Sequence, residues 1–141
     1  MIKAVIFDRH GVLDKVTGEL LRNKIASYTA YHTQQTVKEK IQEPWDQYDL
    51  GILSPADFRA IVQDSFELNE EQTHDCQAYL HTIQPIQELR DIISILEKSY
   101  TLGILSDCPK DKKDVILNQY NQLPQFTYQF RSCDYTKNKA Q

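Results

Sequence analysis

The stretch that decides the fold is MIKAVIFDRHGVLD, residues Met1–Asp14. Its apolar run, Ile2–Phe7, is broken only by Lys3 and ends in the carboxylate of Asp8. Gly11 follows three residues later, where we expect a sharp turn. A nearly continuous apolar run predicts a strand of a parallel sheet that is buried on both faces. Ligands of open α/β sheets bind at the carboxyl ends of the strands, so Asp8 is a candidate nucleophile.

Together with two later segments, this start resembles the haloacid dehalogenase-like (HAD) hydrolases, which are mostly phosphatases. The pattern apolar strand, Asp, x, x, Gly, Val, Leu is similar to their first motif. TLGILSD, residues Thr101–Asp107, resembles the second motif, a buried strand that ends in Ser or Thr, here Ser106. SCDYTKNKA, residues Ser132–Ala140, resembles the third motif, a Ser followed seven residues later by a Lys, here Lys139. The resemblance covers essentially the whole chain.

Hydrophobic spacing predicts an α/β fold. From about residue 18 to residue 83 apolar residues recur at helical spacing, and Ser54-Pro55 is typical of a helix start. Further helices are expected from Pro85 and over residues 111–122. Strands that alternate with helices imply right-handed crossovers and a Rossmann-like parallel sheet. The strands are expected at residues 2–7, 100–105 and 126–130.

The helical block between the first two strands is too long for a single crossover. It resembles the helical cap that many HAD proteins insert after the first motif. Within it, the stretch Trp45–Phe58, WDQYDLGILSPADF, resembles a segment of the capped subgroup that contains sugar-phosphate phosphatases and epoxide-hydrolase N-terminal domains. We therefore expect an α/β core of residues 1–16 and 84–141 and a helical cap of residues 17–83. The core sheet would be incomplete, with about three strands and with Ile2–Phe7 at its edge.

The resemblance implies a role for four residues. Asp8 would attack phosphorus and form an aspartyl phosphate that water then hydrolyses. His10 stands where most HAD phosphatases carry a second Asp; it is either the general acid or base, since imidazole can do that work near neutral pH, or a polar loop residue of a decayed site. Ser106 would donate to a phosphoryl oxygen, or simply cap a turn. Lys139 would neutralise the phosphate, or is a tail lysine.

Magnesium is the cofactor that the resemblance implies. Asp8 and the backbone carbonyl of His10 would hold the ion. The acidic pair of the fourth HAD motif is missing, because the chain ends at Gln141, so the resemblance is to a C-terminally truncated member. Mg²⁺ sites depend on carboxylates, and we therefore expect weak binding. Asp107 stands where the family often has Asn, and its charge would need a nearby lysine, either Lys110, Lys112 or Lys113.

Two other sets of residues have alternative interpretations. His74 and His81 lie seven residues apart, with Cys76 nearby, and are either metal ligands or surface histidines. Four aromatic residues line a substrate pocket or, as their helical spacing favours, belong to the core: Trp45, Tyr48, Phe58 and Phe66.

The composition is that of a soluble globular domain. The 141 residues are 40% hydrophobic and 26% charged. A net charge of −4 does not favour binding to nucleic acid or to an anionic membrane, and no apolar run reaches the ~20 residues of a membrane span. We expect no signal peptide, since the chain enters a strand at once. Three scattered cysteines argue against a disulfide framework, so we expect the cytoplasm.

Three functions remain open. The first is a HAD-like, Mg-dependent phosphatase of small phosphorylated metabolites. The alternative is a catalytically inactive HAD-like binding or regulatory module, or a truncated remnant, which the loss of the second Asp and of the fourth motif favours. The third is dehalogenase-like chemistry. It would need a halide-binding Arg, and Arg9, the neighbour of Asp8, is expected to point away from Asp8. A homodimer or another partner is expected to cover the exposed edge strand.

Overall fold

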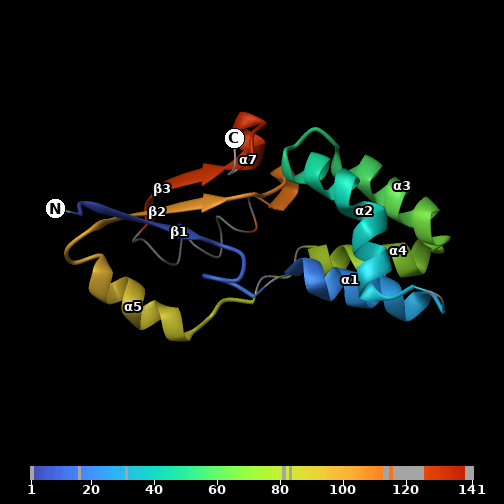
Figure 1. The fold of residues 1–141 in the computed structure, drawn as a ribbon, viewed down its shortest axis with the longest axis horizontal. Coiled ribbons are helices and arrows are strands. Elements are labelled where there is room, and N and C mark those ends of the chain that lie inside the picture. Colours follow the sequence, from blue (N-terminus) through green and yellow to red (C-terminus); the bar gives the residue numbers. More distant parts are fainter. Residues whose placement is uncertain are drawn as a thin grey trace.

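A three-stranded parallel sheet forms one half of the molecule in the computed structural model, which describes residues 2–15, 17–30, 32–80, 82, 84–112, 115 and 126–138. The strand order is β1-β2-β3 (Figure 1). The α/β class and the Rossmann-like parallel sheet predicted from the sequence are confirmed. Among the described strands, the first one lies at the edge of the sheet, as expected. The strands are β1 (Ala4–Asp8), β2 (Thr101–Ser106) and β3 (Phe126–Arg131).

Four helices between β1 and β2 form a helical block at the carboxyl ends of the strands (Figure 1). Ser54 caps one of them, because its hydroxyl accepts the backbone N–H of Asp57 at 3.1 Å and Pro55 occupies the first turn. This predicted helix start is therefore confirmed. The helical block consists of α1 (Thr17–Tyr28), α2 (Gln34–Asp49), α3 (Pro55–Phe66) and α4 (Glu70–Leu80).

The helical block has its own hydrophobic core. The ring of Tyr48 stacks on that of Phe58 with centroids 4.5 Å apart, and Trp45 meets Phe58 edge-on at 5.6 Å. Tyr48, Phe58 and Phe66 are buried, and Trp45 packs against the same cluster. These aromatic residues are thus core residues, which is the alternative that their spacing favoured.

A second core lies between the sheet and helix α5 (Glu88–Leu96), which runs along one face of the sheet (Figure 1). Ile93 of α5 is buried together with Leu102 and Ile104 of β2. The prediction that this helix starts at Pro85 is wrong, because Pro85 forms an isolated bridge with Asp14 and the helix begins only at Glu88.

The opposite face of the sheet is uncovered by any helix of the described chain. Ile6 pairs with Gly103, and Gly103 with Tyr128, so these residues form one row on this face. Ile6 is 59% exposed and Tyr128 is 56% exposed. The prediction that the first strand is buried on both faces is therefore wrong. A nearly continuous apolar run shows that both faces of a strand are suited to burial, but not that other segments pack on both faces.

Two short helical segments lie beyond the carboxyl ends of β2 and β3. Helix α7 (Ser132–Tyr135) begins directly after β3. The predicted helix over residues 111–122 is helical at 110–112 and at Val115, and its remaining residues lie outside the described part of the chain. None of the described helices is long and apolar enough to cross a membrane.

Candidate active site

Asp8 lies at the carboxyl end of β1, at the start of a compact loop. The carbonyl of Arg9 accepts the N–H groups of Leu13 and Asp14 at 2.8 and 3.0 Å, and Gly11 adopts φ 76°. A positive φ favours glycine, which explains the predicted turn there. The side chain of Asp8 is exposed, and its Oδ1 accepts the N–H of Arg9 at 2.6 Å. The loop thus presents a carboxylate to solvent at the strand edge, as the sequence predicted.

Ser106 ends the neighbouring strand but is buried. Asp8 pairs with Leu105, so Ser106 lies one residue further along β2 at the same edge of the sheet. Its side chain is 2% exposed, and its hydroxyl donates to the carbonyl of Asp107 at 3.0 Å. The structure therefore brings Ser106 to the strand ends beside Asp8, with its hydroxyl bonded to the backbone in this conformation.

His10 contacts the side chain of Arg9. The Arg9 guanidinium lies at hydrogen-bond distance from Nε2 of the half-buried His10 ring. Because a guanidinium can only donate, Nε2 accepts, and a neutral ring carries its proton on Nδ1. Arg9 itself is fully buried whereas Asp8 is exposed, so Arg9 points away from the nucleophile, as predicted.

Several charged side chains are buried beneath this loop, and the sequence patterns did not predict their burial. Nε of Arg9 lies 3.5 Å from the carboxylate of Asp14, and both side chains are 1% exposed or less. Among the described residues, Nε and Nη1 of Arg9 have no hydrogen-bond partner. Lys112 is also buried. For Arg9 the sequence signal was a charged residue directly after an apolar strand, and Lys112 was a candidate partner of Asp107.

Desolvation shifts the ionisation of two groups in this region. Burial raises the pKa of the Asp49 carboxyl, at the end of α2, to about 7, although the positive charges of Lys112 and Arg9 oppose the shift. Burial lowers the pKa of Lys112 to about 8, and the charge of Arg9 lowers it further. The end of the helical block and the core loop are therefore electrostatically coupled.

A magnesium ion would find one exposed carboxylate at this edge of the sheet, that of Asp8. Mg²⁺ commonly keeps several waters while bound by one or two carboxylates and a substrate phosphate, so Asp8 could serve as one ligand, with the His10 carbonyl as the second ligand that the sequence predicted. Among the described residues no group of three His, Cys, Asp or Glu side chains could hold a metal.

Three other predicted site residues can be placed only in part. His74 is exposed on α4, and its proposed companion His81 lies outside the described residues, as does Lys139.

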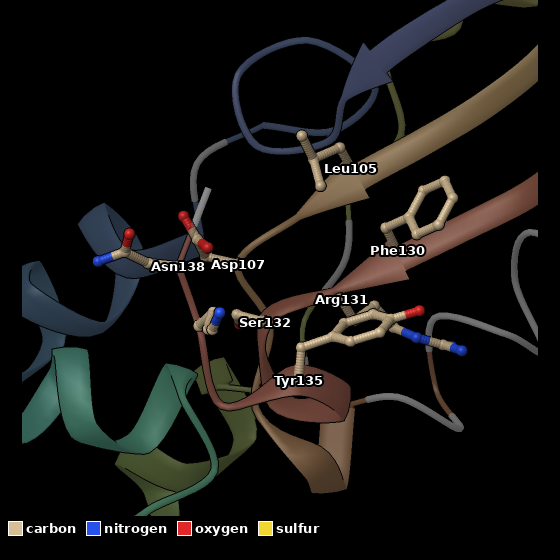
Figure 2. A pocket seen from close by; sticks show the side chains of 8 residues that line it. Leu105, Asp107, Phe130, Arg131, Ser132, Tyr135 and Asn138 are labelled. Carbon is tan, nitrogen blue, oxygen red and sulfur yellow. The ribbon is translucent and has the colours of Figure 1, made fainter. Parts of the chain in front are cut away.

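A groove of about 370 Å³ opens on the uncovered face at the ends of β2 and β3. Leu105 and Phe130 project into it from the two strands, and Tyr135 of α7 lies beside them (Figure 2). Leu105 pairs with both Asp8 and Phe130, so the groove lies one strand away from the candidate nucleophile. Its polar lining consists of Asp107, Arg131, Ser132, Lys137 and Asn138.

Comparison with known proteins identifies the fold. No protein-family model matches the sequence, and no curated protein is significantly similar to it. A HAD-family enzyme from Bacteroides thetaiotaomicron, solved with magnesium and inorganic phosphate, matches 99% of this chain and 73% of its own at 17% identity and a TM-score of 0.73. A predicted HAD-like hydrolase from Porphyromonas gingivalis matches 100% of this chain and 71% of its own, with 20% identity and a TM-score of 0.68.

A dehalogenase has the same architecture. The L-2-haloacid dehalogenase of Xanthobacter autotrophicus matches 99% of this chain and 60% of its own, with 19% identity and a TM-score of 0.61. The chain therefore has the fold of the HAD-family enzymes, as the motifs predicted. Enzymes of different chemistry share this fold, so the reaction has to be argued from the site.

Proposed function

We propose that the chain is a HAD-like hydrolase that removes phosphate from small phosphorylated metabolites in the cytoplasm, with Asp8 as the nucleophile. The observation that carries this proposal is the exposed Asp8 carboxylate at the carboxyl edge of a parallel sheet, beside the end of β2. The backbone N–H of Arg9 donates to one carboxylate oxygen and so orients the group for attack. The fold shared with a HAD enzyme solved with magnesium and phosphate supports the same reaction class.

The proposed reaction has two steps. An oxygen of Asp8 attacks phosphorus, the P–O bond to the alcohol breaks, and the leaving alkoxide takes a proton. Water then attacks the aspartyl phosphate, which releases inorganic phosphate and restores the carboxylate. Magnesium, held by Asp8 and the His10 carbonyl, would neutralise the phosphoryl oxygens when bound.

His10 is the proposed proton donor in the first step. Its contact with Arg9 leaves the ring proton on Nδ1 in the neutral form, so that atom is the one able to donate to a leaving oxygen. Ser106 and Lys139 are the proposed ligands of the phosphoryl group. Ser106 can take that role only after its hydroxyl turns away from the Asp107 carbonyl.

Hydrolysis of a generic phosphate ester by the purified chain, with and without Mg²⁺, tests this proposal. We expect turnover that Asp8→Asn abolishes, because an amide cannot attack phosphorus. Asp64→Asn, at an exposed position on α3, is the matched control and should retain activity. The absence of turnover in a folded wild-type sample would refute the proposal.

The alternative is an inactive HAD-like module that binds phosphorylated ligands. The bonded Ser106 hydroxyl and the histidine in place of the second Asp favour it. Binding of inorganic phosphate without turnover would support this function. Dehalogenase chemistry is less well supported, since Arg9 points away from Asp8; release of halide from a panel of haloacids would reveal it.

We also propose that a second copy or another protein covers the edge strand. Strand β1 has a neighbour on one side only among the described strands, and Ile2 and Ile6 are 71% and 59% exposed. An apolar edge strand presents unpaired backbone groups that favour association.

A further inference from the structure

Ser132 joins three segments that are far apart in the sequence. Its hydroxyl donates to the carbonyl of Asp49, the last residue of α2, at 2.5 Å. The same oxygen accepts the backbone N–H of Cys108, in the loop after β2, at 2.9 Å. Ser132 itself begins α7 directly after β3, and it is 4% exposed. One buried hydroxyl therefore ties the helical block to the ends of two core strands.

Two neighbouring contacts connect the same end of α2 to the core. The hydroxyl of Tyr48 donates to both carboxylate oxygens of Asp111, at 2.8 and 2.7 Å. Gly51 adopts φ +70°, and a Cβ built there would lie 3.0 Å from Cε of Lys110 and 3.3 Å from Cβ of Cys133. Figure 1 shows α2 ending next to the helical stretch 110–112. A side chain at Gly51 would therefore require Lys110 and Cys133 to shift, and it would also be strained by the positive φ.

We propose that Ser132 is a positioning residue that holds the end of α2 and the loop after β2 in one fixed arrangement above the candidate active site. The effect of Ser132 on phosphate binding rests on the proposed function, since the loop after Ser106 is the one that would receive the phosphoryl group. Ser132 touches no reacting atom in this scheme. It acts through Cys108, whose N–H it occupies, and through the Asp49 carbonyl, which anchors the helical block.

The first test needs no turnover. Amide hydrogen exchange measured by NMR should show faster exchange at Cys108 in Ser132→Ala, by about fivefold or more, because the acceptor of its N–H is gone. If Ser132 only accepted the Cys108 N–H and positioned nothing else, exchange would become faster at Cys108 alone. A positioning role also predicts faster exchange at the Gly51 amide, which donates to the Tyr48 carbonyl at 2.9 Å and has no bond to Ser132.

The second test is functional. Inorganic phosphate should bind about fivefold more weakly to Ser132→Ala, and KM for a phosphate ester should rise by a similar factor while kcat changes less. Ser132→Thr, which keeps the hydroxyl, should restore both the exchange pattern and phosphate affinity. Ser27→Ala is the matched control, because that exposed hydroxyl bonds only within its own helix, to the Lys24 carbonyl at 2.6 Å.

The outcomes separate this proposal from the proposed function. A folded Ser132→Ala chain with wild-type exchange at Gly51 overturns the positioning role, whatever the activity. If Ser132→Ala does not fold, Ser132→Cys replaces it, because a thiol keeps the size of the side chain but accepts the Cys108 N–H only weakly. Exchange should then be faster at Cys108 and at Gly51, and an unchanged Gly51 amide overturns the proposal. No turnover in any folded variant refutes the phosphatase function alone.

Discussion

The fold should lose stability between pH 5 and pH 7 because of Asp49. Burial raises the pKa of this carboxyl from 3.8 to about 7, the negative charge of Asp107 adds to the shift, and Lys112 and Arg9 oppose it. Between those two pKa values the folded chain keeps a proton that the unfolded chain has released. The contribution of the protonated Asp49 carboxyl to the free energy of unfolding is thus fully present below about pH 4, and it is lost as the pH rises to 7.

The size of this effect follows from the same values. Within the window, each pH unit lowers the free energy of unfolding by up to about 1.4 kcal/mol. Because the change flattens as the pH reaches the folded-state pKa, the step from pH 5 to pH 7 amounts to about 2 kcal/mol at most. Lys112, whose pKa is about 8, contributes little change below pH 7.

Urea unfolding at pH 5 and pH 7 measures this contribution. The wild type should lose up to about 2 kcal/mol relative to Asp49→Asn, whose amide does not titrate and keeps the shape of the side chain. Asp64→Asn on the surface of α3 controls for the loss of one charge and should follow the wild type. Equal pH dependence in the wild type and in Asp49→Asn would show that the Asp49 carboxyl is not desolvated in solution.

Three further predictions concern the backbone, the edge strand and a thiol. Gly51→Ala should lower the free energy of unfolding by about 1–2 kcal/mol, because the residue has φ +70° and its Cβ would crowd Lys110; urea unfolding that matches the wild type would contradict this. Ile6→Lys should shift the chain toward the monomer in analytical ultracentrifugation if β1 and the face next to it mediate association, since Ile6 is 59% exposed there. An unchanged oligomer would place the contact elsewhere, and a wild-type monomer would remove the proposal of self-association. Burial raises the pKa of the Cys108 thiol from 9.0 to about 12, so at pH 8 it should react with an alkylating reagent about 1,000-fold more slowly in the native chain than in urea, in proportion to the thiolate fraction. Equal rates in the two states, read by mass spectrometry, would mean that this loop is open to solvent.

The sequence by itself determined the order and type of the main elements. The apolar runs before Asp8 and Ser106 predicted the first two strands, and Ser54-Pro55 predicted the start of α3. These features depend on residues close together in the chain, through side-chain periodicity, capping and turn geometry. Because parallel strands end at one edge, the sequence also placed Asp8 and Ser106 at that edge.

Only the tertiary structure decided which of these groups are buried and what they contact. The pattern of Ile2–Phe7 could not show that Ile6 would stay exposed on one face of β1, and nothing local to Ser106 indicated that its hydroxyl would be buried. Ser132 was visible as part of a motif, but its bonds to Asp49 and Cys108 join segments distant in the chain. Burial and desolvation depend on the packing of such distant segments, and no local sequence pattern contains that information.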